Sequence, residues 1–257
     1  DLGKATYDRW CAGCHGVDGT GNGSASDYML PRPRDFSQAL YQVRSTASGG
    51  LPTDEDLLYV IDNGMPGSTM PGWEDVLSRE ERDALVLYVK TFSRFFSPDE
   101  QPESLDFGRA TRANDEVLAE GKAQYEAIEC WRCHGDQGRG DGESSSTLAD
   151  DDDFPIRAAD LTENWQFNGG GNVEDIYRRL RTGMDGTPMP NFSDVIDGGI
   201  ISDDQLWAVA HYVRSLAPEE EPGVTEVVRA QLLEETTLPT SVTDETWDDV
   251  ERVHIPL

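Results

Sequence analysis

Two copies of the pattern Cys-x-x-Cys-His hold the residues of this chain whose types and spacing point to chemistry. Their reactive side chains are Cys11, Cys14 and His15 in the first copy and Cys130, Cys133 and His134 in the second. In this spacing, two cysteines form thioether bonds to a porphyrin and the adjacent histidine binds its iron. The motifs use all four cysteines of the chain, so no thiolate is left to complete a zinc site. We therefore predict two covalently attached haem c groups, with a zinc site or a redox dithiol as the weaker alternative.

The rest of the chain repeats with the same offset as the two motifs. A separation of 119 residues relates three pairs, namely His15 and His134, Met65 and Met184, and Met70 and Met189. Before the motifs a glycine and a tyrosine recur at an offset of 118, and after the methionines the second copy gains five residues. A fixed period of this kind indicates duplicated domains.

Each copy is predicted to be a mostly helical unit of about 100 residues, a normal size for one compact domain. A first helix is expected at residues 2–10 in the first copy and 116–129 in the second, and a short later helix at 53–62 and 173–181. The last helix of each copy begins with a capping-box pattern, at Ser78 with Glu81 and at Ser202 with Gln205. The predicted fold class is therefore all-α.

The loops that carry the methionines offer a second axial ligand for each iron. We choose Met70 and Met189, because a proline follows each of them and an aromatic residue comes shortly after. An iron bound by a histidine and a methionine has no open position for a substrate, and its reduction potential is higher than that of an iron bound by two histidines. The alternatives are ligation by Met65 or Met184, the earlier methionines of the same loops, and methionines that only fill gaps in the core.

These features together resemble a known family. A glycine and an aromatic residue on the first helix, Cys-x-x-Cys-His-Gly, a Met-Pro loop and Leu-x-x-Tyr-Val on the last helix resemble class I cytochrome c, twice over. The resemblance covers about residues 1–96 and 116–217, and residues 183–192 look like those of the tandem dihaem cytochromes c of bacterial respiratory chains. It implies one-electron transfer between periplasmic partners. The bulky Trp131-Arg132 pair inside the second motif departs from the usual pattern.

Two arginines are candidates for holding haem propionates. Arg34 and Arg157 precede Asp35 and Asp160 at broadly matching places between each haem motif and the second helix. A planar guanidinium pairs with a carboxylate through two hydrogen bonds. The alternative is a solvated loop arginine at each place, and the carbonyl of Pro33 is a candidate support for the first iron-binding histidine.

The net charge of the chain indicates which kinds of partner it can bind. Fifty acidic residues face 21 basic ones, the net charge is −29 and the isoelectric point is near 4.2. Nucleic-acid binding is disfavoured, because phosphate contacts need clustered cations. A strongly negative field would steer a basic redox partner, and the alternative is that the acidity serves solubility at high salt.

The predicted organisation is a first cytochrome c domain (1–97), a polar linker (98–115), a second cytochrome c domain (116–217) and an extended tail (218–257). The tail resembles the opening of the haem-binding domain related to ethylbenzene dehydrogenase, in its Leu238-Pro239 turn and the following Trp247. Its end, residues 253–257, is a candidate edge strand for a partner or for self-association. The alternative is a loosely ordered terminus.

The resemblance also predicts the compartment. Attachment of haem c implies maturation outside the bacterial cytoplasmic membrane, so we expect a periplasmic or extracellular protein. No apolar stretch approaches the length needed to span a bilayer. The chain lacks a signal peptide, and we expect it to be the mature form of an exported protein.

We therefore predict an electron carrier, not an enzyme. A dihaem peroxidase needs a five-coordinate haem, which the paired methionines argue against, and a cysteine-ligated thiosulfate-oxidising enzyme is excluded by the cysteine count. The alternatives kept are a subunit of an extracellular cytochrome filament and an electron-transfer subunit of an oxidoreductase complex. The two remaining histidines, His211 and His254, are expected not to bind iron within their own chain.

Overall fold

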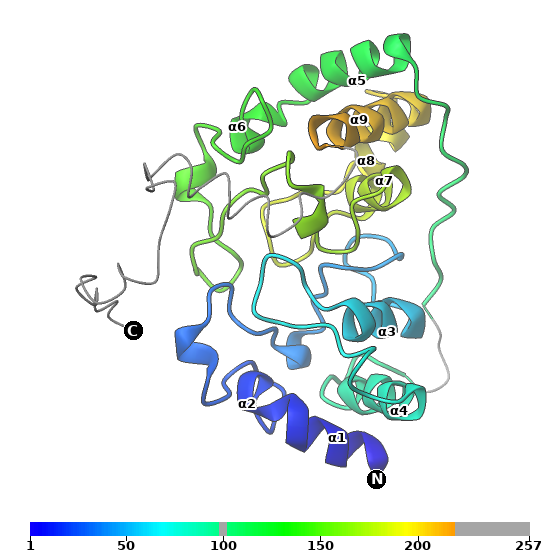
Figure 1. Cartoon of the computed structure of the whole chain (residues 1–257). Coiled ribbons are helices and arrows are strands. Elements are labelled where there is room, and N and C mark those ends of the chain that lie inside the picture. The colour runs from blue at the N-terminus through cyan, green and yellow to red at the C-terminus, as the bar shows by residue number, and fades with distance from the viewer. Residues whose placement is uncertain (98–101, 219–257) are drawn as a thin grey trace, which may run out of the picture. The chain divides into compact units, whose positions relative to one another are not determined.

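The computed structural model describes residues 1–97 and 102–218, and these residues belong to one compact unit. Helices dominate this part of the chain, and within it there is no β-strand beyond a single bridge between Ala149 and Pro155 (Figure 1). The predicted all-α class is confirmed. No helix in the described ranges is both long and apolar enough to cross a membrane.

The first repeat, residues 1–97, is built from four α-helices. They are α1 (Leu2–Trp10), α2 (Ala12–His15), α3 (Asp54–Asn63) and α4 (Arg79–Lys90), with 3-10 turns at Ser26–Tyr28 and Phe36–Gln38. Helix α4 packs against both α1 and α3. Their apolar faces meet in a core that contains Tyr7, Leu57, Ile61, Leu85 and Val89.

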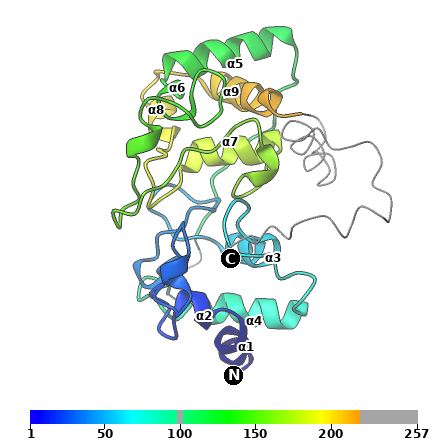
Figure 2. The ribbon, with the colours of Figure 1, turned by 60° about the vertical axis from the view of Figure 1, so that its left-hand side comes forward.

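The second repeat, residues 116–217, follows the same plan with one helix added. Its elements are α5 (Asp115–Ala127), α6 (Trp131–His134), α7 (Val173–Thr182), α8 (Ser193–Asp197) and α9 (Asp203–Leu216), with 3-10 turns at Ser145–Thr147 and Asn164–Gln166. Helix α9 packs against α5 and α7, and both views show α5 running alongside it (Figures 1 and 2). The core contains Tyr125, Tyr177, Leu180, Leu206 and Val209.

One glycine in each repeat allows the first and last helices to cross closely. A Cβ atom at Gly3 would lie 2.2 Å from the main-chain oxygen of Ala84, and one at Gly121 would lie 2.0 Å from that of Ala208. Real Cβ atoms do not approach an oxygen so closely, so any other residue would push the helices apart. The recurring glycine of the sequence is thus explained by the same helix crossing in both repeats.

The predicted helix starts are confirmed by their caps. Ser78 and Glu81 form a reciprocal capping box at the start of α4, and Ser202 and Gln205 form one at the start of α9. In each box the serine hydroxyl accepts from a main-chain N–H of the first turn, and the longer side chain accepts from the N–H of the serine.

Each of the two length differences between the repeats can be located in the structure. Helix α5 ends at Ala127, two residues earlier than expected, and Glu129 adopts a left-handed conformation with φ of 62° just before Cys130. This residue accommodates the extra position that changes the offset from 118 to 119. The five residues gained after the methionines lie between Phe192 and Ser202, where the chain forms the additional helix α8.

Candidate functional site

The two Cys-x-x-Cys-His motifs form the short helices α2 and α6. The amide of each motif histidine donates to the carbonyl of the first cysteine, at 2.9 Å for His15 and Cys11 and at 3.0 Å for His134 and Cys130. This single turn places the two cysteines and the histidine of a motif together at one end of each repeat. All four cysteines are partly exposed and none forms a disulfide, so their sulfur atoms can reach a porphyrin.

The rings of both motif histidines are held in the same way. Nδ1 of His15 lies 3.1 Å from the main-chain oxygen of Arg34, and Nδ1 of His134 lies 3.0 Å from that of Ala159. A carbonyl oxygen can only accept, so Nδ1 carries the proton and Nε2 is left with a free lone pair. Burial lowers the pKa of both imidazoles, which favours this neutral form. A neutral imidazole oriented through its other nitrogen suits an iron ligand, so these residues fit haem c.

The carbonyl that supports His15 differs from the one suggested by the sequence. It belongs to Arg34, one residue after Pro33. The second repeat does have a counterpart, because the carbonyl of Ala159 occupies the same role for His134. The structural equivalent of Arg34 is therefore Ala159, and Arg157 lies two residues before that position.

A tyrosine of the first helix supports each motif from the other side. The hydroxyl of Tyr7 donates to the carbonyl of Gly16 at 2.7 Å, and that of Tyr125 donates to the carbonyl of Gly135 at 2.6 Å. Each glycine directly follows the motif histidine. Both tyrosines are buried, so these bonds fix the chain just after the motif histidine. Their recurrence was visible in the sequence, but their role was not.

Both methionine loops close through equivalent main-chain hydrogen bonds. The amide of Met65 donates to the carbonyl of Met70 at 3.0 Å, and the amide of Met184 donates to the carbonyl of Met189 at 3.1 Å. The earlier methionine of each loop is thereby paired with the later one, and the chain between them forms a tight turn.

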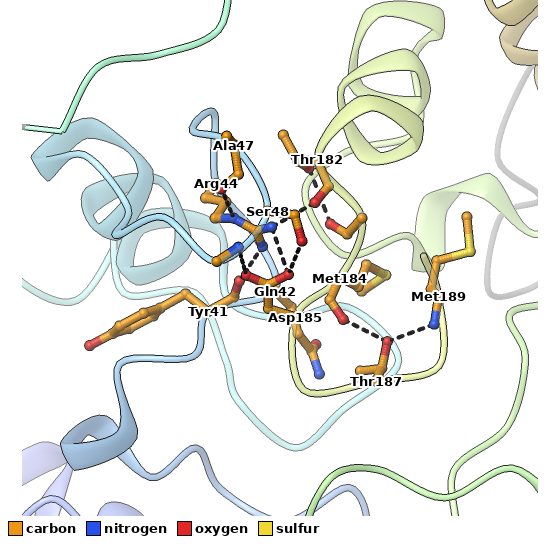
Figure 3. A network of polar contacts seen from close by, with 12 residues as sticks. Tyr41, Gln42, Arg44, Ala47, Ser48, Thr182, Met184, Asp185, Thr187 and Met189 are labelled. Carbon is orange, nitrogen blue, oxygen red and sulfur yellow. Dashed lines mark hydrogen bonds and ion pairs between the residues drawn. The ribbon is translucent and has the colours of Figure 1, made fainter. Parts of the chain in front are cut away.

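A hydroxyl inside each loop completes the closure. In the second loop Thr187 donates to the carbonyl of Met184 at 2.7 Å and accepts from the amide of Met189 at 3.2 Å (Figure 3). In the first loop Ser68 makes the same two contacts. The Met189 side chain is half-buried and packs against the core of the second repeat.

The two candidate propionate-binding arginines have different surroundings. Arg34 is partly buried, and burial lowers its pKa although Asp150 acts in the opposite direction. It donates no side-chain hydrogen bond within the described residues, and nearby the buried hydroxyl of Tyr41 is likewise unpartnered there. A guanidinium and a hydroxyl that have no hydrogen-bond partner among the described residues suit an anionic group such as a propionate. Arg157, by contrast, is exposed.

Of the two remaining histidines, the structure describes only His211, which belongs to α9 and not to a motif. His211 on α9 is buried, and its Nε2 lies 2.8 Å from the main-chain oxygen of Thr111. That nitrogen donates to the carbonyl and so has no lone pair for iron. His254 lies outside the described residues, and so do the residues on which the other predictions for the tail rest, including those that resemble the ethylbenzene dehydrogenase-related domain.

Comparison with known proteins agrees with this geometry. The family described as cytochrome c matches residues 118–217, and the family described as cytochrome c oxidase, cbb3-type, subunit III matches residues 1–89. Cytochrome c6 of Chlorolobion braunii is 32% identical over 88 residues, which are 34% of this chain and 84% of that protein. The chain belongs to the cytochrome c family. Both repeats are class I cytochrome c units in tandem, as predicted, and domains of this family carry covalently bound haem c.

Two further proteins are similar to this cytochrome c over most of its length. A solved chain of the reducing HAO-like protein complex of Kuenenia stuttgartiensis is 44% identical, with a TM-score of 0.79, over 85% of this chain and 96% of that chain. The Cbb3-type cytochrome c oxidase subunit CcoP of Rhodobacter capsulatus is 29% identical over 221 residues, 84% of this chain. This chain spans 62% of the length of that subunit.

Proposed function

We propose that this cytochrome c carries two covalently attached haem c groups and relays single electrons between protein redox partners. Cys11 and Cys14 would anchor the first group, and Cys130 and Cys133 the second. The observation that carries the proposal is the twofold occurrence of one arrangement, in which an imidazole Nδ1 donates to a carbonyl and leaves Nε2 free. When bound, each group supplies an iron that accepts and returns one electron.

The chain's own residues would keep both irons six-coordinate. His15 and His134 would bind the irons through Nε2, and Met70 and Met189 would bind them through sulfur. Two protein ligands leave no position for a substrate, which favours electron transfer over ligand chemistry. The carbonyls of Arg34 and Ala159 and the hydroxyls of Tyr7 and Tyr125 hold the histidine side of each site in place.

Arg34 is the stronger of the two arginine candidates for binding a haem propionate. Its buried guanidinium would pair with a propionate, and the hydroxyl of Tyr41 would donate to the same anion. We assign Arg157 a weaker contact of the same kind, since its exposed side chain is screened by water. The domain boundaries that accompany this assignment are residues 1–97 and 116–217, with a linker at 98–115 and a tail at 218–257.

The partners are proposed to be basic redox proteins in the periplasm or outside the cell. A net charge of −29 attracts a cationic surface and speeds encounter at low salt. The similarity to a chain of a reducing HAO-like protein complex favours a second setting, in which this cytochrome is the electron-transfer subunit of a multi-subunit oxidoreductase.

A count of haems and electrons tests the proposal. A pyridine haemochrome assay on denatured protein should find two covalent haems per chain, and an anaerobic reductive titration should consume two electrons per chain. Cys14→Ala and Cys133→Ala should each disrupt attachment at one site, while Ser144→Ala, outside the motifs, should leave the count at two. One covalent haem in the unaltered protein, or turnover of peroxide at enzymic rates, would overturn the assignment.

A further inference from the structure

A fully buried arginine of the first repeat reaches into the methionine loop of the second. Arg44 donates from Nη1 to the carbonyl of Tyr41 at 2.8 Å and from Nη2 to the carbonyl of Thr182 at 2.6 Å. The same Nη2 lies 2.8 Å from a carboxylate oxygen of Asp185. Asp185 is the only carboxylate within ion-pair distance of Arg44 among the described residues. Asp185 therefore supplies the close counter-charge of this buried cation, and Asp56 acts in the same direction without forming an ion pair.

Asp185 is held by two more donors from the first repeat. The hydroxyl of Ser48 lies 3.0 Å from one carboxylate oxygen, and the amide of Gly49 lies 2.8 Å from the other (Figure 3). Asp185 directly follows Met184 and sits four residues before Met189. Three donors on one carboxylate thus tie the second methionine loop to the chain between Arg44 and Gly49.

A second arginine fixes the helix from which this loop emerges. Arg179, on the last turn of α7, donates to the carbonyl of Gln42 at 2.9 Å and to that of Arg44 at 2.6 Å. A shift of the first residues of the loop would therefore also break these hydrogen bonds between the repeats.

The methionine loop of the first repeat has no such attachment. Pro66 occupies the place that corresponds to Asp185. In the described part of the chain, residues 64–71 form no hydrogen bond or ion pair with the second repeat. Gly67 does lie beside the second repeat, since a Cβ atom there would be 3.5 Å from Gln166, at the distance of ordinary van der Waals contact. The two loops share one internal geometry and differ in what holds them from outside.

We propose that Arg44 and Asp185 are positioning residues through which the first repeat holds Met189 against its iron. Release of Met189 requires the loop to move, and movement of Asp185 leaves the guanidinium of Arg44 buried without its counter-charge. Met189 is therefore displaced more slowly than Met70. This inference rests on the proposed ligation by the two methionines.

Displacement of methionine by imidazole tests the inference. Excess imidazole is added to the oxidised holoprotein, and loss of the sulfur-to-iron charge-transfer band is followed over time. Two phases of equal amplitude are expected, the fast one absent from Met70→Ala and the slow one absent from Met189→Ala. Asp185→Asn should accelerate the slow phase at least about tenfold, since a hydrogen bond to a charged group is lost, and should leave the fast phase unchanged.

Milder and matched variants keep the test independent of folding. Ser48 is exposed, so Ser48→Ala should fold normally and accelerate the same phase by roughly threefold, through loss of one of the three donors. Ser104→Ala removes the contact of the linker with Ser45, which does not involve the methionine loop, and should change neither phase.

The outcomes separate this inference from the proposed function. Unchanged kinetics in both Asp185→Asn and Ser48→Ala, or a slow phase that belongs to Met70, would overturn the positioning role while leaving methionine ligation intact. Equal acceleration by Ser104→Ala would show general loosening of the interface and would also overturn it. A charge-transfer band that survives unaltered in both Met70→Ala and Met189→Ala would contradict the proposed ligation itself.

Discussion

Arg179 of the second repeat donates a hydrogen bond from Nη2 to the main-chain oxygen of Arg44 in the first repeat, 2.6 Å away. Arg44 in turn donates to the main-chain oxygen of Thr182, three residues beyond Arg179. The repeats thus exchange arginine-to-carbonyl contacts. Burial lowers the pKa of both guanidinium groups, that of Arg179 to about 10. Arginine suits this interface because one planar guanidinium group can donate hydrogen bonds to several carbonyl oxygens at once.

Replacement of Arg179 by lysine tests that explanation. A single ammonium cannot reproduce the two separate bonds to the carbonyls of Gln42 and Arg44, so Arg179→Lys should lower the free energy of unfolding by about 1–3 kcal/mol. Chemical denaturation of the holoprotein measures the change. Arg178→Lys is the matched control, because Arg178 is partly exposed and pairs with Asp175 by charge, and it should change stability by less than about 0.5 kcal/mol. Equal effects of the two variants would show that the fork geometry of Arg179 is unimportant.

The capping box of α4 predicts a dependence of stability on pH. The main-chain N–H and the hydroxyl of Ser78 hold the pKa of Glu81 below its ordinary value. A carboxyl whose pKa is depressed on folding adds stability above its unfolded pKa and loses it as the pH falls through the folded one. Glu81→Gln should therefore make the melting temperature fall less steeply than that of the unaltered protein as the pH drops from about 6 to about 3.

The second repeat provides the control for this prediction. Gln205 already fills the corresponding position in the capping box of α9, and a neutral amide does not titrate. Gln205→Glu should add to the acid-dependent loss of stability that Glu81→Gln removes. Identical pH profiles for all three proteins would contradict a contribution from the charge of the capping residue.

The sequence was sufficient for the repeats and their helices because the determinants are local. The motif at Cys11, the capping boxes and the helix-crossing glycine at Gly3 each act within a few residues or at a fixed period, and all recur in the second copy. The fold class followed from these signals together. The additional helix α8 was visible only as an insertion, since five extra residues carry no clear helical pattern.

The rest depended on contacts that no local pattern encodes. Arg34 and Arg157 looked equivalent because both precede an aspartate, but the loops differ in length, and Ala159 takes the place of Arg34 beside the histidine. The ion pair between Arg44 and Asp185 joins residues far apart in the chain, and Asp185 has Pro66, an uncharged residue, at the repeat offset, so the pair does not recur. Such contacts depend on how the two repeats pack against each other, and the repeat pattern of the sequence does not determine that packing.

The intensity of the sulfur-to-iron charge-transfer band in the oxidised holoprotein tests the central claim most directly. Met70→Ala and Met189→Ala should each reduce the band by roughly half, because each removes one of two iron–sulfur bonds, and the double variant should abolish it. Met65→Ala and Met184→Ala, in the same loops, should leave it unchanged. A band that is reduced by the control variants, or that persists in the double variant, would contradict an electron carrier with histidine and methionine on both irons.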